Sequence, residues 1–167
     1  MVLVGLVLLA SNVFLLVQNI QLRKSLEQAK QIVTDEGYNF PDLKIKGLDG
    51  NDETVDFSDK KVKTLLLVFS PSCVYCLQEY PYWRELIGSI DRKDWRVVAV
   101  TSETDLEKIK NHIEEQKLEN IKVGSMSRED IRAARMLYTP MTMILDSEGR
   151  VRRVWPGLWK NAFDLTF

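Results

Sequence analysis

The stretch from Lys63 to Cys76 reads KTLLLVFSPSCVYC, and it predicts the fold of this chain. Its first half contains the unbroken apolar run Leu65–Phe69, which is typical of a central strand buried on both faces. A Cys-x-x-Cys pair, Cys73 and Cys76, begins four residues after the end of this run, and helical sequence follows through about Ile87. Cysteines so close together cannot join distant segments, so this pair indicates local chemistry rather than a structural disulfide framework.

Strands and helices alternate on both sides of this stretch. Upstream, apolar residues at 43–45 and 54–57 flank the turn Leu48–Asn51 and predict a β-hairpin. Downstream, the pattern predicts a strand at 96–101, a helix at 105–117, a strand at 121–123, a helix at 127–137 capped by Ser127, and a closing hairpin of strands 141–145 and 151–155. Leu158–Phe167 is predicted to begin a last helix. This order predicts a three-layer α/β domain.

The position of the cysteines favours dithiol redox chemistry. A helix N-terminus carries unsatisfied N–H groups and a partial positive charge, which favour a thiolate over a thiol. We therefore expect Cys73 to have a lowered pKa and to be the attacking nucleophile, and Cys76 to resolve the mixed disulfide. Structural zinc requires four ligands, and the chain has a single histidine, His112. We expect His112 to be exposed or half-buried on its charged helix, and we predict no metal.

The N-terminal segment differs in kind from the rest of the chain. From Val2 to Val17 it carries no charge. As a helix it would span about 24 Å, somewhat short of the roughly 30 Å hydrocarbon core, so that residues 18–20 would lie at the interface. We predict a transmembrane anchor over residues 1–20. A cleaved signal peptide and a buried core helix are the alternatives, although no charged n-region precedes the apolar run.

Residues 21–38 are predicted to form a helical stalk, and residues 39–167 the globular domain. Apolar residues repeat at a 4-3-4 spacing between Leu22 and Val33, which leaves a solvated helix or a short dimer seam open. Arg23 and Lys24 follow the apolar segment, and the positive-inside rule would place the domain in the cytoplasm. We nevertheless predict the extracytoplasmic, periplasmic side, because disulfides form and persist there.

Composition excludes a general attraction to nucleic acid. The 167 residues contain 23 Lys and Arg against 24 Asp and Glu, so no bulk positive field exists. The length fits one domain of ordinary size with an additional segment attached.

Three separated motifs resemble the thioredoxin-like redoxins, and within them the membrane-anchored TlpA/ResA type. The motifs are FPDL at 40–43 with LDG at 48–50, FSPSCVYCLQEYP at 69–81, and YTP at 138–140 with SEGRV at 147–151. They span about residues 40–157. The resemblance implies a thioredoxin-like three-layer α/β/α sandwich with an N-terminal β-hairpin, and a thiol:disulfide oxidoreductase that needs no cofactor.

The resemblance also assigns roles to single residues. Pro140 would be a cis-proline facing the cysteines, with a proline that starts an edge strand as the alternative, and Thr139 would offer backbone groups to an extended substrate. Pro81 would kink the active-site helix, and Gly157 would match a glycine beyond the last strand. Glu79 occupies the position of a glutamate that assists proton transfer in cytochrome c maturation reductases. Its alternative role is a favourable charge in the first turns of a helix.

The active-site turn departs from the common pattern of these redoxins. Ser72 replaces the tryptophan usual before the first cysteine, so that Ser-Pro-Ser-Cys resembles the MauD-like redoxins, and Val74-Tyr75 lacks the common proline. Both changes leave the redox potential and the direction of electron flow open.

The predicted function is reduction or exchange of disulfides in extracytoplasmic proteins, with a membrane protein as the electron donor. By resemblance, the clients include an apocytochrome c or another metalloprotein precursor. A peroxiredoxin-like peroxidase is one alternative, but Leu66 and Ser70 stand where its proline and threonine belong. A copper-binding or chaperone module that uses both thiols is another, and it lacks a well-placed partner histidine.

Overall fold

The computed structural model describes residues 11–23, 37–57, 62–118 and 120–158. The chain divides into two compact units, Met1–Thr34 and Asp35–Phe167. In the first unit, residues 11–23 are helical and their side chains are exposed. Within the described part of the chain, no helix has the length and apolar character needed to span a membrane. Half of the predicted anchor, residues 1–10, and most of the predicted stalk, residues 24–36, lie outside the described residues, so both remain predictions.

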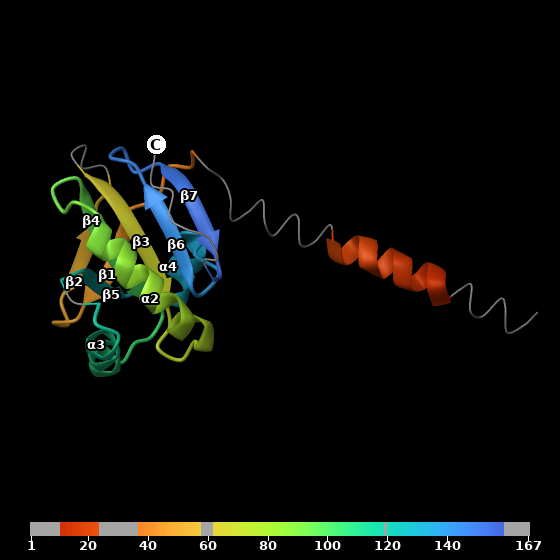
Figure 1. Cartoon of the computed structure of the whole chain (residues 1–167), viewed down its shortest axis with the longest axis horizontal. Helices are drawn as coiled ribbons and strands as arrows, with labels where there is room; N and C mark the ends of the chain where they lie inside the picture. The colour runs from red at the N-terminus through yellow and green to blue at the C-terminus, as the bar shows by residue number, and fades with distance from the viewer. Residues whose placement is uncertain (1–10, 24–36, 58–61, 119, 159–167) are drawn as a thin grey trace, which may run out of the picture. The chain divides into compact units, whose positions relative to one another are not determined.

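The second unit is built on a mixed sheet of seven strands in the order β2-β1-β5-β4-β3-β6-β7 (Figure 1). The strands are β1 (Leu43–Gly47), β2 (Asp52–Val55), β3 (Lys63–Phe69), β4 (Trp95–Thr101), β5 (Lys122–Ser125), β6 (Met141–Leu145) and β7 (Val151–Pro156). The helices are α2 (Val74–Ser89), α3 (Leu106–Glu115) and α4 (Arg128–Ala133). The predicted central strand and both predicted hairpins are confirmed.

Strand β3 lies in the interior of the sheet, between β4 and β6. It runs parallel to β4, with Phe69 opposite Thr101, and antiparallel to β6, with Val68 opposite Met141. The continuous apolar run of β3 is buried on both faces, as the sequence predicts. Because β6 begins beside the end of β3, the residues before β6 arrive next to those that follow β3.

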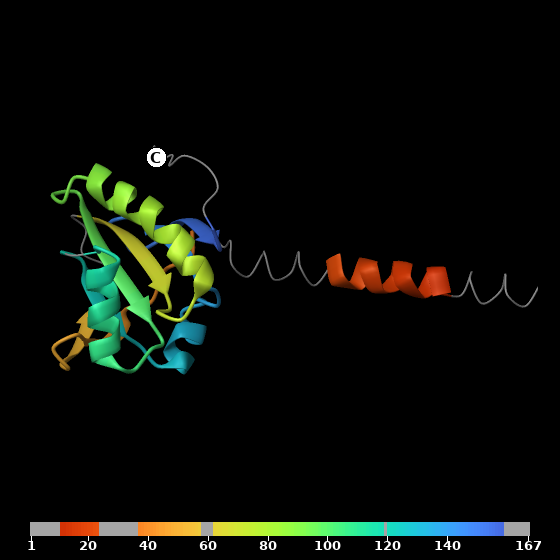
Figure 2. The same cartoon turned by 60° about the horizontal axis from the view of Figure 1, so that its bottom comes forward.

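Helices cover both faces of the sheet, and the layers are visible in two views (Figures 1 and 2). Helices α2 and α3 share one face, where their buried side chains join the odd-numbered residues of β3 and β4 in a single apolar core. This core includes Leu65, Leu67, Phe69, Tyr80, Trp83, Leu86, Trp95, Val97, Ala99, Ile109 and Ile113. Helix α4 lies on the opposite face (Figure 1). The predicted three-layer arrangement is therefore confirmed.

Helix α2 is fixed to the sheet by a buried stripe of side chains. Cys76, Tyr80 and Trp83 follow the i, i+4, i+7 spacing that places residues on one helix face, and all three are fully buried. The indole Nε1 of Trp83 donates a hydrogen bond of 2.8 Å to Oγ1 of Thr142 on β6. Pro81 lies inside the helix on its exposed side. The stripe thus ties the active-site helix to the strand that follows Pro140.

The C-terminal helices differ from the sequence prediction. Ser127 caps α4, accepting a hydrogen bond from the backbone of Asp130, as expected. However, α4 ends at Ala133 rather than at Leu137. Arg135 adopts a positive φ of 59°, which lies outside the right-handed α-helical region and therefore ends the helix. The helix predicted from Leu158 onward falls almost wholly outside the described residues and stays a prediction.

Candidate active site

The two cysteines lie at the N-terminus of α2. Cys73 is the N-cap, with extended backbone angles of φ −91° and ψ 112°, and its N–H donates to the Ser70 carbonyl at 3.0 Å. The carbonyl of Cys73 accepts the N–H of Cys76 at 3.1 Å. Both thiols are free; Cys73 is half-buried and Cys76 is fully buried. One thiol therefore stands at the helix mouth and the other lies one turn inside.

A cis peptide bond joins Thr139 and Pro140, which confirms the predicted cis-proline. The Sγ of Cys73 lies 3.4 Å from the carbonyl oxygen of Thr139. Pro140 is buried and Thr139 is exposed. Gly157, at a φ of 80°, donates its N–H to the Pro140 carbonyl at 2.8 Å. The structure thus brings together the cysteines, the cis-proline loop and the glycine beyond the last strand, which are far apart in the sequence.

The two thiols have opposite acidities. Partial burial opposes ionisation of Cys73, but hydrogen bonds from the side chain and backbone of Cys76 outweigh it, so that the pKa of Cys73 is lowered. Burial dominates at Cys76 and raises its pKa to about 12. The arrangement therefore pairs a thiol that ionises more readily than an ordinary cysteine with a thiol that stays protonated at neutral pH.

Exposed apolar side chains lie on the two segments that meet at Cys73, the start of α2 and the loop before the cis bond. We define the rim as Val74, Tyr75 and Leu77 on α2 together with Leu137 and Tyr138 before the cis bond; their exposed fractions run from 67% for Val74 to 41% for Tyr138. Helix residues this apolar are usually turned inward. A group of them beside a reactive thiol forms a surface suited to contact with another protein.

Three buried polar side chains lie on α2 and α3, and we define them as the floor: Glu79, Tyr80 and His112. The exposed fraction of Glu79 and of Tyr80 is 0%, and that of His112 is 8%. Tyr80 Oη and His112 Nε2 are hydrogen-bonded at 2.7 Å. The His112 ring also stacks on Phe69, with centroids 6.1 Å apart.

The prediction that His112 is exposed or half-buried is therefore wrong. His112 lies between Ile109 and Ile113 on the helix face that packs against the sheet, and its ring finds a polar partner in Tyr80. Burial is the main cause that lowers the pKa of His112. Tyr80 was not among the predicted site residues, although its i, i+4 spacing from Cys76 was a signal for it.

Glu79 lies further into α2 than a residue whose role is a favourable charge near the helix N-terminus. The first turn of α2 contains no acidic residue, and Glu79 lies five residues after Val74 and is buried. The effect of the helix macrodipole fades within the first turn, so a surface charge at the helix end does not describe this residue. A buried carboxyl one turn beyond Cys76 is instead in a position to affect the thiol chemistry.

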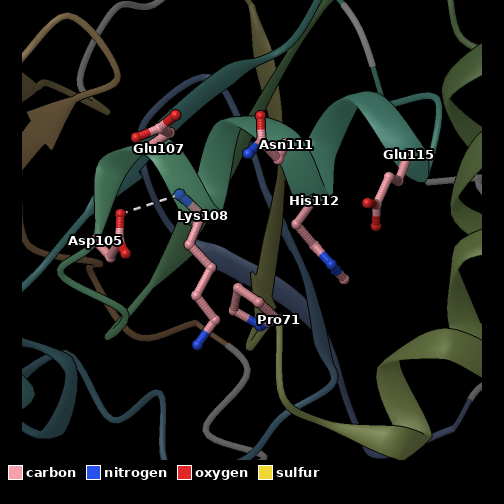
Figure 3. A pocket seen from close by; sticks show the side chains of 7 residues that line it. All are labelled: Pro71, Asp105, Glu107, Lys108, Asn111, His112 and Glu115. Atoms are coloured by element: carbon pink, nitrogen blue, oxygen red, sulfur yellow. Dashed lines mark hydrogen bonds between the residues drawn. The ribbon is translucent and has the colours of Figure 1, made fainter.

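An open pocket of about 400 Å³ lies beside the active-site turn (Figure 3). Pro71 lines it on one side, and α3 lines the other with Lys108, His112 and Glu115 among its residues. The Lys108 ammonium group bonds Glu103 and also lies 3.4 Å from Oγ of Ser72, directly before the nucleophile.

Within the described ranges, no three or more His, Cys, Asp and Glu side chains are grouped so as to hold a metal ion. A copper module would need a histidine ligand, but Nε2 of His112 is hydrogen-bonded to Tyr80.

Comparison with known proteins identifies the family and the fold. The Redoxin family profile matches residues 35–157. Among solved structures, the chain is similar to the thioredoxin domain of a thiol-disulfide oxidoreductase from Bacteroides vulgatus (20% identity, TM-score 0.61, covering 71% of this chain and 86% of that one). It is also similar to StoA from Bacillus subtilis (20%, 0.57, 71% and 90%) and to a thiol-disulfide isomerase from Corynebacterium glutamicum (23%, 0.57, 74% and 90%). These similarities confirm the thioredoxin-like fold.

Proposed function

The chain belongs to the redoxin family and is a thioredoxin-like oxidoreductase, and we propose that it is a membrane-anchored enzyme that reduces disulfides in extracytoplasmic proteins. The observation that carries the proposal is the placement of the Cys73 sulfur at a helix N-terminus, 3.4 Å from the carbonyl of a cis-proline loop. Cys73 is only half-buried and Thr139 is exposed, which supports approach of a client sulfur to Cys73 and pairing of a client backbone with Thr139.

The first step is attack by Cys73. Its thiolate displaces one sulfur of the client disulfide, forming a mixed disulfide between Cys73 and the client while the other client sulfur leaves and takes up a proton. The lowered pKa of Cys73 supports this order, because the thiolate is the attacking species. The exposed Thr139 supplies a carbonyl and an N–H to an extended client segment.

The second step belongs to Cys76. It loses its proton, attacks the Cys73 sulfur and releases the second client thiol, leaving the Cys73–Cys76 disulfide. A pKa of about 12 makes this proton difficult to remove. Glu79, buried one helical turn further along, is our candidate for the group that accepts it.

The rim supports a protein client rather than a small peroxide. Its apolar side chains are exposed beside the reactive sulfur, where an unfolded or extended polypeptide would cover them. We propose an apocytochrome c or another metalloprotein precursor as the client, by resemblance to maturation reductases.

The uncharged segment Val2–Val17 supports the anchor. We propose that it holds the domain on the periplasmic side, near both the clients and a membrane electron donor that reduces the pair again. Protease treatment of intact cells or spheroplasts tests the side, and complete protection of the domain would contradict it.

The central experiment is turnover of a protein disulfide by the full-length chain and by two cysteine variants. We expect Cys73→Ala to reduce turnover to the level of the buffer, and Cys76→Ala to accumulate a mixed disulfide with the client. Equal rates for the wild type and Cys73→Ala would refute the proposal. Consumption of peroxide, or tight copper(I) binding, would instead favour one of the two alternative functions.

A further inference from the structure

We propose that His112 is a positioning residue that couples, through Tyr80, the charge of the Cys73–Cys76 pair to proton exchange with solvent. This inference rests on the proposed function, since it concerns the same thiols. Tyr80 and His112 are buried titratable groups that the exchange reaction described above does not use.

The first link is between the thiols and Tyr80. Cys76 and Tyr80 lie four residues apart on one face of α2, and both side chains are completely buried in the same core. Burial raises the pKa of Tyr80, and the negative charges of Cys76 and Cys73 raise it further. The phenol therefore experiences the charge of the cysteine pair.

The second link is between Tyr80 and His112. Their hydrogen bond is 2.7 Å long and their rings lie 5.3 Å apart in an edge-to-face arrangement. Phe69, at the end of β3, stacks on the imidazole with an interplanar angle of 6°. In the neutral tautomer that carries its proton on Nδ1, His112 accepts a hydrogen bond from the phenol at Nε2, whereas an imidazolium donates at this atom. Protonation of that tautomer therefore reverses the direction of the bond.

The third link connects His112 to solvent. The imidazole lines the open pocket between Pro71 and α3 (Figure 3). Around it stand Tyr80 from α2 and two charged residues of α3: Glu115, which favours the imidazolium, and Lys108, which opposes it. A proton can reach the ring from this pocket without crossing the apolar core.

The coupling follows from the charge balance of the reaction. The reduced pair with Cys73 as thiolate carries a negative charge, which favours imidazolium, and oxidation to the disulfide removes that charge. Two electrons pass to the client disulfide, whose two sulfur atoms take up two protons. The Cys76 thiol supplies one proton. Solvent supplies the other when His112 is neutral, and His112 releases a proton of its own when it is imidazolium.

The test is an NMR titration of the imidazole in the full-length chain, in detergent where solubility requires it. His112 is the single histidine of the sequence, so its ring signal is unambiguous. We expect the His112 pKa to be higher in the dithiol form than in the disulfide form, by about half a pH unit or more. Reciprocally, protonation of His112 should favour the thiolate by about threefold.

Two matched variants separate coupling from packing. Tyr80→Phe keeps the buried ring but removes the hydroxyl, and it should largely abolish the difference between the two redox forms. Tyr82→Phe makes the same change on the exposed side of α2 and should preserve the difference. His112→Gln keeps a hydrogen-bond acceptor that cannot titrate. In this variant the glutathione equilibrium should match the wild type at alkaline pH and depart from it in mild acid, where wild-type imidazolium stabilises the reduced form.

Identical titration curves in the two redox forms would overturn the inference, as would an unchanged difference in Tyr80→Phe. Both forms are prepared chemically, so the titration does not depend on client turnover. A wild type that titrates as expected but does not reduce any protein disulfide would refute the proposed function alone. An active wild type with identical curves would refute the coupling alone, and a chain that cannot form the Cys73–Cys76 disulfide would refute both.

Discussion

The rim and the floor of the active site belong to two thiols that lie one helical turn apart, and they have opposite character. The rim exposes apolar side chains, including Tyr75 at 62%, around a half-buried thiol. The floor buries polar and titratable side chains, Glu79, Tyr80 and His112, around a thiol that is completely enclosed. Each region thus reverses the usual distribution, in which apolar groups are inside and titratable groups outside.

The difference shows how one helix end can make two identical side chains perform different tasks. The helix mouth and its hydrogen bonds stabilise negative charge at Cys73, whereas burial disfavours it at Cys76. The rim is therefore suited to capture a client, and the floor to hold a proton until the mixed disulfide has formed.

The largest expected effect is the difference in alkylation rate between the two thiols. The pKa of Cys73 is lowered from its ordinary value and that of Cys76 is raised to about 12, so their thiolate fractions at neutral pH differ by about 10³-fold or more. The greater nucleophilicity of the more basic thiolate offsets part of this ratio, but burial of Cys76 restricts access of the reagent.

The measurement follows iodoacetamide alkylation of Cys73 in the reduced wild type, located by mass spectrometry, and of Cys76 in Cys73→Ala, across pH. The wild type is used for Cys73 because the Cys76 side chain lowers the pKa of that thiol. The Cys73 rate should level off below the ordinary cysteine pKa, and the Cys76 rate should continue to rise toward pH 12. Two profiles with the same midpoint would remove the distinction between rim and floor.

Glu79→Gln should have the next largest effect. Loss of the buried carboxyl removes our candidate acceptor for the Cys76 proton, so release of the mixed disulfide should slow by about 10²-fold, with a changed pH profile. Attack by Cys73 should change little. Glu85→Gln, an exposed site on the same helix, is the control. An unchanged pH dependence in Glu79→Gln would assign that residue a purely structural role.

How much of this could be predicted from the sequence differs between the two regions. The strand Lys63–Phe69 and the cysteine pair were predicted from local signatures, an unbroken apolar run and a fixed spacing, and the cis bond at Pro140 was implied by the resemblance to redoxins. The pairing of β3 with β6 then brings these local features together.

The bond between Tyr80 and His112 could not be predicted in the same way. The spacing of Ile109, His112 and Ile113 places the imidazole on the apolar face of α3, but its polar partner depends on how α3 packs against α2 and β3. Its bond with Tyr80 joins residues 32 positions apart. The early end of α4 has a similar origin, since the left-handed backbone at Arg135 is a matter of tertiary context.

A smaller effect is expected from the hydrogen bond between Trp83 of α2 and Thr142 of β6. Thr142→Val keeps the shape of the side chain but leaves the buried indole N–H of Trp83 without its acceptor, which should reduce the free energy of unfolding by about 1–3 kcal/mol. Thr54→Val, on the exposed side of β2, should change it by less than about 0.5 kcal/mol. Urea denaturation of both variants measures the difference. Equal midpoints would show that the Trp83 bond does not hold α2 in place.

The smallest effect is expected at the rim, and it separates capture from chemistry. Tyr75→Ala removes an exposed ring beside Cys73 and leaves the thiol and the floor intact, so it should weaken binding of a protein client by about 1 kcal/mol, or about fivefold in KM. Because this contact is equal in the ground state and the transition state, kcat should not change. Glutathione disulfide is too small to cover the rim, and its reduction should be unaffected. Tyr82→Ala, further along α2, should leave KM and kcat unchanged for both substrates. A fall in kcat with both substrates would mean that Tyr75 shapes the helix mouth itself, and rim and floor would then be a single unit.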